Sequence, residues 1–426
     1  MKRENPAFNM NFLLLTLART VSDMGTGMQA VIIPLYIIDI GRSAATVGLF
    51  SFLSLMPALL VYPFAGVLGD RSNRKLITIA TDLASAVLLL GLAFAAHADR
   101  MSLSLLFTVQ VLVALLFGFF DPASKGMLPQ LVPQNNLTRA NSLLATVRIL
   151  SVMLSSVIGA VLYSRLGISV VILINGISFL ISAASSLLIR YHHVNGSASS
   201  SSSLLKDLAE GIRFIRNNKV IRTMCAFFLV VFALIQPIFA VVLPLFFKTR
   251  LAYSDTQYGY LRMIIVLGGV LGSILVGIIF GKDKTVIKPL AAGCGLLMFT
   301  ILVFAALLFP QCLSLLGSGT LLYFVLLSGF SALVSAAVMF VNIPVQTYIQ
   351  RSTPNEYMSR VFAIVEMISK GGMPIGALIY GLILTRLPVH WTGLISALLT
   401  IFISAAFMAS LLKASELKQY SQELSE

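Results

Sequence analysis

Long runs of apolar residues, separated by short polar stretches, make up most of the chain from residue 12 to residue 412. Each run is roughly 20 residues or longer, which is the length that a helix needs to cross the hydrocarbon core of a bilayer. The pattern therefore predicts an all-α membrane protein with twelve transmembrane helices. The predicted spans are residues 12–38, 45–69, 76–96, 102–126, 141–163, 168–189, 222–247, 256–280, 289–309, 319–343, 361–385 and 391–412.

One connection is much longer than the others and divides the spans into two groups of six. It begins with a Ser-rich piece at 197–203 and continues at 204–216, where Leu and Ile recur at helical spacing opposite basic residues. We expect a flexible linker followed by an amphipathic helix on the membrane surface. The predicted domains are an N-terminal six-helix bundle at 1–190, a cytoplasmic linker with its helix at 191–221, and a C-terminal six-helix bundle with a short tail at 222–426.

The two halves share a motif in corresponding loops. Pro133–Arg139 follows the fourth span and Pro354–Arg360 follows the tenth, and both read Pro-x-x-x-x-(Thr/Ser)-Arg. A proline precedes each motif, Pro122 in the first half and Pro344 in the second. The repeat indicates a six-plus-six duplication into two pseudo-symmetric bundles. Such duplications are typical of transporters that bind substrate near the middle of the membrane and open to its two sides in turn.

Composition and charge agree with the membrane class. Of the 426 residues, 58% are hydrophobic and 11% are charged, and the mean hydropathy is +0.94. The net charge of +14 comes from Lys and Arg scattered among short loops, so we expect no nucleic-acid partner. These loops gather on the side that holds both termini. The positive-inside rule then predicts a multi-pass protein of the bacterial inner membrane with both termini in the cytoplasm.

A short basic loop joins the second and third spans. It runs from Gly66 to Lys75 and places Asp70, Arg71, Arg74 and Lys75 at a hairpin turn on the predicted cytoplasmic side. A carboxylate there can accept hydrogen bonds from a neighbouring helix N-terminus while the cations hold the same inner face. We therefore expect this loop to act as the inner gate.

Ionisable residues within the first and fifth spans are candidates for the transport site. A charge at the bilayer centre costs about 2.5 to 3.5 kcal/mol, so it usually faces a cavity or a partner. Asp23 lies near the middle of the first span, four residues after Arg19 and on the same helical face. Our hypothesis is that Asp23 takes and releases a proton and contacts a cationic substrate in a cavity that Arg19 and Arg148 also line. The alternative is a structural pair between Arg19 and Asp23 that only neutralises itself.

Three further carboxylates lie inside spans. Glu366 and Lys370 repeat the four-residue spacing in the eleventh span, as either a second proton-coupling site or a structural ion pair. Asp82 in the third span and Asp121 in the fourth lie toward the cytoplasmic side. We interpret both as charge partners in gate or interhelix contacts, with a direct role in proton transfer as the alternative.

Polar and small residues mark other places in the spans. Gln236 precedes Pro237, and Asn342 lies two residues before a proline. We assign both amides to the substrate cavity, because prolines free backbone carbonyls there, and a kink solvated by neighbouring helices is the alternative. Gln110 is the only strongly polar residue of the fourth span before its aspartate. The small residues of the fifth span, among them Ser155 and Gly159, predict close helix packing.

Motifs for other classes of protein are absent from the sequence. There is no Gly-x-x-x-x-Gly-Lys-(Ser/Thr) loop for ATP, and no hydrolase or metal motif. The three cysteines, Cys225, Cys294 and Cys312, lack metal-ligand spacing. We therefore expect a transporter rather than an enzyme, with no cofactor and no metal. Its expected partners are a small amphipathic substrate, protons and the lipid bilayer, and we expect a monomer.

The loop from Gly66 to Lys75 resembles the loop between the second and third helices of the major facilitator superfamily, although Asn73 stands where that family usually has Gly. Asn best tolerates a left-handed backbone, so we expect the turn to be kept. Phe119–Ala123, Leu128–Asn141 and Glu210–Arg216 resemble the macrolide-efflux group of drug:proton antiporters. The resemblance implies proton-coupled efflux of amphipathic drugs, and hence antibiotic resistance. The alternatives are a transporter of a physiological substrate, such as a lysolipid, siderophore or peptide, and a non-transporting membrane sensor.

Overall fold

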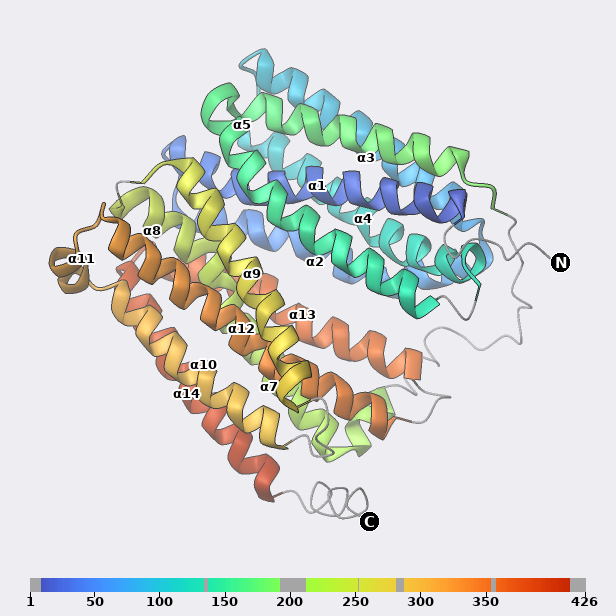
Figure 1. Cartoon of the computed structure of the whole chain (residues 1–426). Coiled ribbons are helices and arrows are strands. Elements are labelled where there is room, and N and C mark those ends of the chain that lie inside the picture. The colour runs from blue at the N-terminus through green and yellow to red at the C-terminus, as the bar shows by residue number, and fades with distance from the viewer. Residues whose placement is uncertain are drawn as a thin grey trace. The chain divides into compact units, whose positions relative to one another are not determined.

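The computed structural model describes residues 9–133, 137–191, 212–251, 253–280, 287–353 and 358–413, which form helices and no strand (Figure 1). Ten helical stretches among these residues are long and apolar enough to cross a membrane. The prediction of an all-α membrane protein is confirmed. The helices of the first part of the chain are α1 (Met10–Asp39), α2 (Ala44–Arg71), α3 (Arg74–His97), α4 (Leu103–Leu131) and α5 (Leu137–Leu188).

The second part of the chain continues in the same way. Its elements are α7 (Lys219–Pro237), the π-helix η2 (Ile238–Val242), α8 (Leu243–Arg250), α9 (Asp255–Phe280), α10 (Ile287–Leu307), the short α11 (Pro310–Leu316), α12 (Leu321–Ser352), α13 (Met358–Ile383) and α14 (Val389–Lys413). The fifth and sixth predicted spans both lie in α5, where Gly167, at φ +78°, breaks the helix. Only glycine adopts this backbone conformation without strain, so one residue turns the chain from one span into the next.

Contacts between residues divide the chain into two compact units. The first unit comprises Met1–Tyr36, Leu53–Ser201 and Asp255–Met263, and the second comprises Ile37–Phe52, Ser202–Ser254 and Ile264–Glu426. The domain boundaries at 190 and 221 stay a prediction. Residues 192–211 lie outside the described part of the chain, so of the predicted amphipathic helix at 204–216 only the segment from 212 is seen, and it is helical.

Close contacts between helices hold the first unit together. The α3 helix packs against α4 and α5, while Asn9, before α1, donates its side-chain amide to Leu131 O at 2.9 Å. A Cβ atom at Gly159 of α5 would lie 3.1 Å from the Met28 Cα of α1. A Cβ atom at Gly27 of α1 would likewise lie 3.1 Å from the Ser155 Cβ of α5. The small residues of the fifth span thus allow α1 and α5 to approach each other closely.

The second unit is built on α7 against α13 and α10 against α12. The rings of Phe227 and Phe407 stack with centroids 3.9 Å apart and join α7 to α14. The segment Ile37–Phe52 also belongs to this unit. There Asp39, the last residue of α1, forms an ion pair of 2.9 Å with Lys248 of α8.

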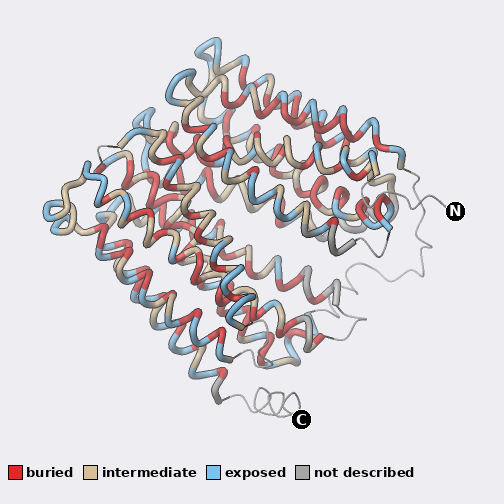
Figure 2. The backbone as a smooth tube through the Cα atoms, viewed as in Figure 1, coloured by how far each residue is buried: buried red, intermediate tan, exposed pale blue. Residues whose placement is uncertain are grey.

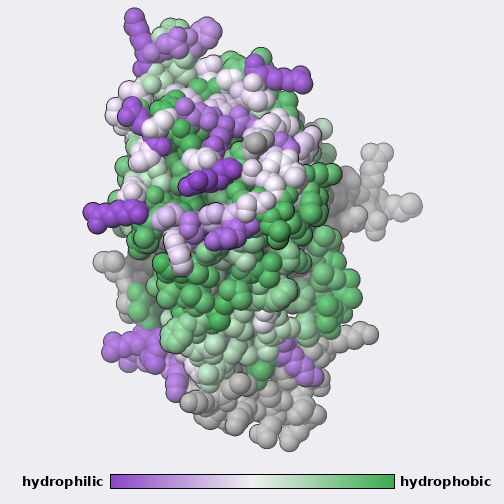
Figure 3. All heavy atoms as spheres, turned by 90° about the vertical axis from the view of Figure 1, so that its left-hand side faces the viewer, coloured by the Kyte–Doolittle hydropathy of each residue, from purple (hydrophilic) through white to green (hydrophobic). Residues whose placement is uncertain are grey.

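Exposed residues recur along the helices (Figure 2), and many of them are large and apolar, so that hydrophobic residues cover much of the surface seen in Figure 3. Phe64, Phe94, Ile278 and Phe402 are examples from four different helices. A water-soluble protein rarely exposes so much contiguous apolar surface. These positions match the face that a membrane-spanning helix presents to lipid.

Candidate functional site: a polar cluster inside the first unit

Arg19 and Asp121 form a buried ion pair between α1 and α4. Arg19 Nη2 lies 2.9 Å from Asp121 Oδ1, and Nη1 donates to Ser124 Oγ at 2.5 Å. The guanidinium also lies over the ring of Phe120, 5.9 Å from its centroid. The alternative of an Arg19–Asp23 pair along α1 is therefore wrong, because the long arginine side chain reaches across to the carboxylate of the neighbouring helix.

Asp121 has a second cationic partner. Lys125 Nζ, one turn further along α4, donates to Asp121 Oδ2 at 2.7 Å. The Lys125 side chain is 55% exposed, so this interaction is screened far more than the one with Arg19. Both oxygens of Asp121 are thus engaged, and the charge on this carboxylate is well compensated.

Asp23 is placed differently from Asp121. Its side chain is only 16% exposed, and Arg148 Nε of α5 lies 3.9 Å from Asp23 Oδ2, beyond hydrogen-bond distance. The structure therefore brings the predicted residues together in two pairs, Arg19 with Asp121 and Asp23 with Arg148. The second pair is the looser one, since its arginine is half exposed.

An amide cluster that the sequence did not predict lies in the same unit. Gln29 Nε2 of α1 donates to Gln110 Oε1 of α4 at 3.3 Å, and Asn175 Nδ2 of α5 donates to Gln29 Oε1. Ser178 Oγ donates to Asn175 Oδ1 at 3.2 Å. The only signal in the sequence was one strong hydrogen-bonding amide in each of three separate apolar runs. Nothing in the sequence shows that these runs turn their amides toward one another.

Asp82 makes a contact of its own within the first unit. Ser182 Oγ of α5 donates to Asp82 Oδ2 at 2.6 Å. The other carboxylate oxygen, Oδ1, is buried and has no hydrogen-bond partner among the described residues. The structure therefore gives Asp82 an interhelix contact between α3 and α5 through a hydroxyl group.

The described part of the predicted gate fixes helix ends. Arg74 Nη1 donates to Gly126 O of α4 at 2.5 Å, and Lys75 Nζ donates to Leu187 O and Ile189 O, each at 2.8 Å. These cations satisfy carbonyls near the C-terminal ends of α4 and α5, where a positive charge is favourable. Gly66 lies within α2, and the side chains of Asp70 and Arg71, which complete the predicted gate, lie outside the described residues.

The turn at Asn73 is kept as expected, but not through a left-handed backbone. Its backbone is extended rather than left-handed, at φ −64° and ψ 107°, and its side chain accepts a hydrogen bond from Lys75 N. Asn73 is thus the N-cap of α3, a position that asparagine favours because its side-chain oxygen replaces a missing helical acceptor. The turn keeps its function in the helix hairpin by capping, without the left-handed residue that a glycine allows.

In the second unit, Lys370 Nζ donates to Glu366 Oε1 along α13, and both side chains are substantially exposed. Asn342 is partly buried on α12. The side-chain oxygen of Gln236, at the end of α7, is buried without a partner among the described residues.

The backbone around Pro237 is satisfied by a neighbouring helix. In a regular helix Leu234 O would accept from the amide of residue 238, but that amide bonds elsewhere. Instead the Tyr380 hydroxyl of α13 donates to Leu234 O at 3.0 Å. At Leu234 the described contacts agree with a kink whose free carbonyl is hydrogen-bonded by a neighbouring helix. The side-chain oxygen of Gln236 accepts no hydrogen bond from the described residues.

These helices and buried polar groups define a multi-pass membrane protein with charges inside its spans. The model of the Major Facilitator Superfamily matches residues 15–373 of the chain. The chain belongs to the Major Facilitator Superfamily and is a membrane transporter.

Several known proteins resemble all or much of the chain. It is 25% identical over 408 residues to Macrolide efflux protein A of Streptococcus pyogenes, covering 93% of this chain and 95% of that protein. It is 27% identical over 278 residues to Multidrug efflux pump Tap of Mycolicibacterium fortuitum, covering 62% and 65%. The crystal structure of the nucleoside transporter NupG superimposes with a TM-score of 0.75 at 14% identity, covering 96% and 100%. That likeness confirms the major facilitator fold.

Proposed function

We propose that this transporter exports amphipathic drugs, macrolides among them, in exchange for protons across the bacterial inner membrane, with both termini in the cytoplasm. Two relatives that are named for macrolide and multidrug efflux support the substrate class. The observation that carries the proton coupling is the environment of Asp23, a mostly buried carboxylate whose arginine neighbour lies 3.9 Å away.

The difference between the two carboxylates of the cluster supports this role. Asp121 accepts from Arg19 and Lys125, so a proton would have to displace two cations from it. Among the described residues Asp23 has one ion pair, the looser contact with Arg148 at 3.9 Å, and interacts with Arg19 and Lys125 only through space, so its charge changes with less rearrangement. In the proposed cycle, a cationic substrate and a proton compete for Asp23, and each leaves when the other binds. Access alternates between the two sides of the membrane as in other transporters built from repeats.

The amide cluster has a place in this proposal. Gln29 follows Asp23 on α1 at a separation of six residues, and it joins α1 to α4 and α5 through Gln110 and Asn175. Hydrogen bonds of this kind hold neighbouring helices in a fixed rotation. The cluster would therefore keep the carboxylate of Asp23 turned toward Arg148 while the substrate exchanges with the proton.

The test uses purified protein in liposomes with an imposed pH gradient, while lumenal pH is followed as macrolides, cationic dyes and lysolipids are added. Wild type should release protons on addition of a macrolide or dye, and Asp23→Asn should not. Asp99→Asn is the matched control, because Asp99 is an exposed carboxylate at φ +54°, which asparagine tolerates. Glu366→Gln, in the same assay, decides whether α13 carries the second proton site or only an ion pair.

Two results would reject the proposal. Proton release in Asp23→Asn equal to that of wild type would remove the carrier role from this carboxylate. Transport of lysolipids without any substrate-linked proton movement, in protein shown to be folded, would favour the physiological-substrate alternative.

A further inference from the structure

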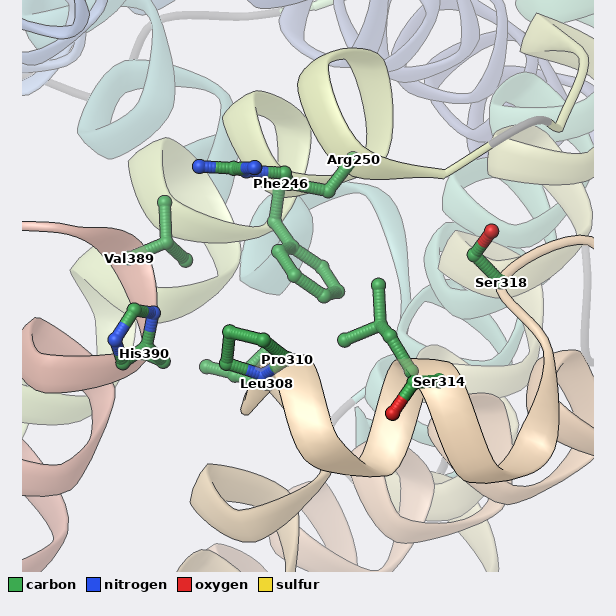
Figure 4. A pocket seen from close by; sticks show the side chains of 9 residues that line it. Phe246, Arg250, Leu308, Pro310, Ser314, Ser318, Val389 and His390 are labelled. Carbon is green, nitrogen blue, oxygen red and sulfur yellow. The ribbon is translucent and has the colours of Figure 1, made fainter.

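A pocket at one end of the second unit has no part in the proposed proton exchange (Figure 4). Its volume is about 320 Å³, at the lower end of the range for small-ligand sites. Arg250 and Phe246 come from α8, Ser314 from α11, Ser318 from the turn that follows α11, and His390 from the start of α14. The pocket thus gathers residues from three parts of the second unit.

The polar groups of the pocket are hydrogen-bond donors. Arg250 supplies a guanidinium, His390 an imidazole and Ser318 a hydroxyl, while the Ser314 hydroxyl already donates to Gln311 O at 2.9 Å. No carboxylate is found among the described residues that line it. A planar guanidinium with further donors around it is suited to a phosphate or carboxylate group. The remaining lining side chains are apolar, Phe246 among them, so the matching ligand is an anion with an apolar part.

The surroundings of the pocket point to lipid as the source of that ligand. The α11 helix borders the pocket and has no buried residue, and its Leu315 is 84% exposed. Trp391, next to His390, is about half exposed and meets the ring of Phe309 edge-on at 5.7 Å. Exposed Leu and Trp side chains at the end of membrane helices are typical of the interface between headgroups and acyl chains.

We propose that this pocket binds the phosphate headgroup of an anionic phospholipid, with Arg250 as the main phosphate ligand and His390 and Ser318 as further donors. The acyl chains would lie against Leu315 in the bilayer. Basic pockets between membrane helices bind anionic headgroups in this way. The binding itself is independent of the proposed transport. With both termini in the cytoplasm, as proposed above, the pocket would lie at the outer leaflet.

Native mass spectrometry of the purified full chain tests the site, with phosphatidylglycerol or phosphatidylethanolamine added to lipid-depleted protein. Wild type should retain one phosphatidylglycerol that Arg250→Gln binds roughly 10-fold to 100-fold more weakly, the loss expected for a charge-assisted hydrogen bond. Arg250→Lys should lose part of the affinity, because it keeps the charge without the planar fork. Arg386→Gln is the matched control, since it removes an exposed arginine that does not line the pocket.

Either of two results would overturn the proposal. Equal retention of phosphatidylglycerol by wild type and Arg250→Gln, both shown to be monodisperse by size exclusion, would mean that the pocket does not select anionic lipid. Inorganic phosphate that binds in millimolar titrations with the same dependence on Arg250, without a preference between the two lipids, would assign the pocket to free anions. Neither readout requires transport, so failure here and failure of the proposed export are distinguishable.

Discussion

The stability of variants at the Arg19–Asp121 ion pair measures how far water reaches these buried charges in the first unit. The Arg19 side chain is 11% exposed, and replacing Asp121 by asparagine keeps an acceptor oxygen but removes the negative charge that compensates the buried guanidinium. Removing one member of a buried pair costs about 3 to 5 kcal/mol, because an uncompensated charge remains. We expect Asp121→Asn to lower the free energy of unfolding by this amount.

Lys125→Ala is the matched control for that variant. It removes a cation from the same carboxylate, but the lysine is largely exposed, so the expected cost is at most about 1 kcal/mol. The double variant Arg19→Met with Asp121→Leu should recover most of the loss, since apolar side chains of similar size often replace a buried ion pair without penalty. Reversible unfolding in mixed micelles by added SDS measures all three.

Equal costs for Asp121→Asn and Lys125→Ala, both below about 1 kcal/mol, would refute the reasoning, because they would show that water reaches Arg19. A functional consequence follows from the spacing on α1. In Asp121→Asn the guanidinium is free to turn to Asp23, four residues along the same helix, so proton release on addition of substrate should also fall. Unchanged coupling in a destabilised protein would separate the two effects.

Two further predictions concern packing and buried charge. Gly259→Ala places a Cβ 2.7 Å from Ser156 O and should cost about 1 to 3 kcal/mol of stability, whereas Gly277→Ala on the same helix, which meets nothing within 4 Å, should cost nothing. Asp82→Asn keeps an acceptor for Ser182 and removes a buried carboxylate, so the same unfolding assay should show equal or higher stability. A clear loss would mean that an ionised carboxylate is needed at that position.

The spans could be predicted from the sequence because the bilayer dictates their length and composition. Every predicted span has a helical counterpart, and α13, which is not one of the ten apolar stretches, corresponds to the eleventh. The break between the fifth and sixth spans was expected at 164–167, and the helix is broken there at Gly167. The backbone of Asn73 differs from the expected left-handed conformation because capping of α3, which needs an extended residue, decides its φ and ψ.

The partners of the buried polar groups could not be predicted in the same way. Spacing along one helix suggests only neighbours such as Arg19 and Asp23, whereas the contact of Arg19 with Asp121 joins two different spans. The rotation of each helix about its own axis decides which polar side chains meet, and a run that is apolar on all sides does not encode it. Gln29 and Asn175 were missed for this reason.

The span Lys219–Arg250 contains the π-helix Ile238–Val242. The exact number of residues in this span therefore decides which way its last turns face, although its hydropathy would be the same with one residue fewer. A π-helix corresponds to one residue inserted into an α-helix, and each helical residue turns the chain by about 100°. Lys248 faces Asp39 with this insertion in place. A descendant that lost one residue here would still span the membrane, yet α8 would be rotated and Lys248 would face elsewhere. A one-residue gap in an alignment at this point would therefore mark a change of ion-pair partner.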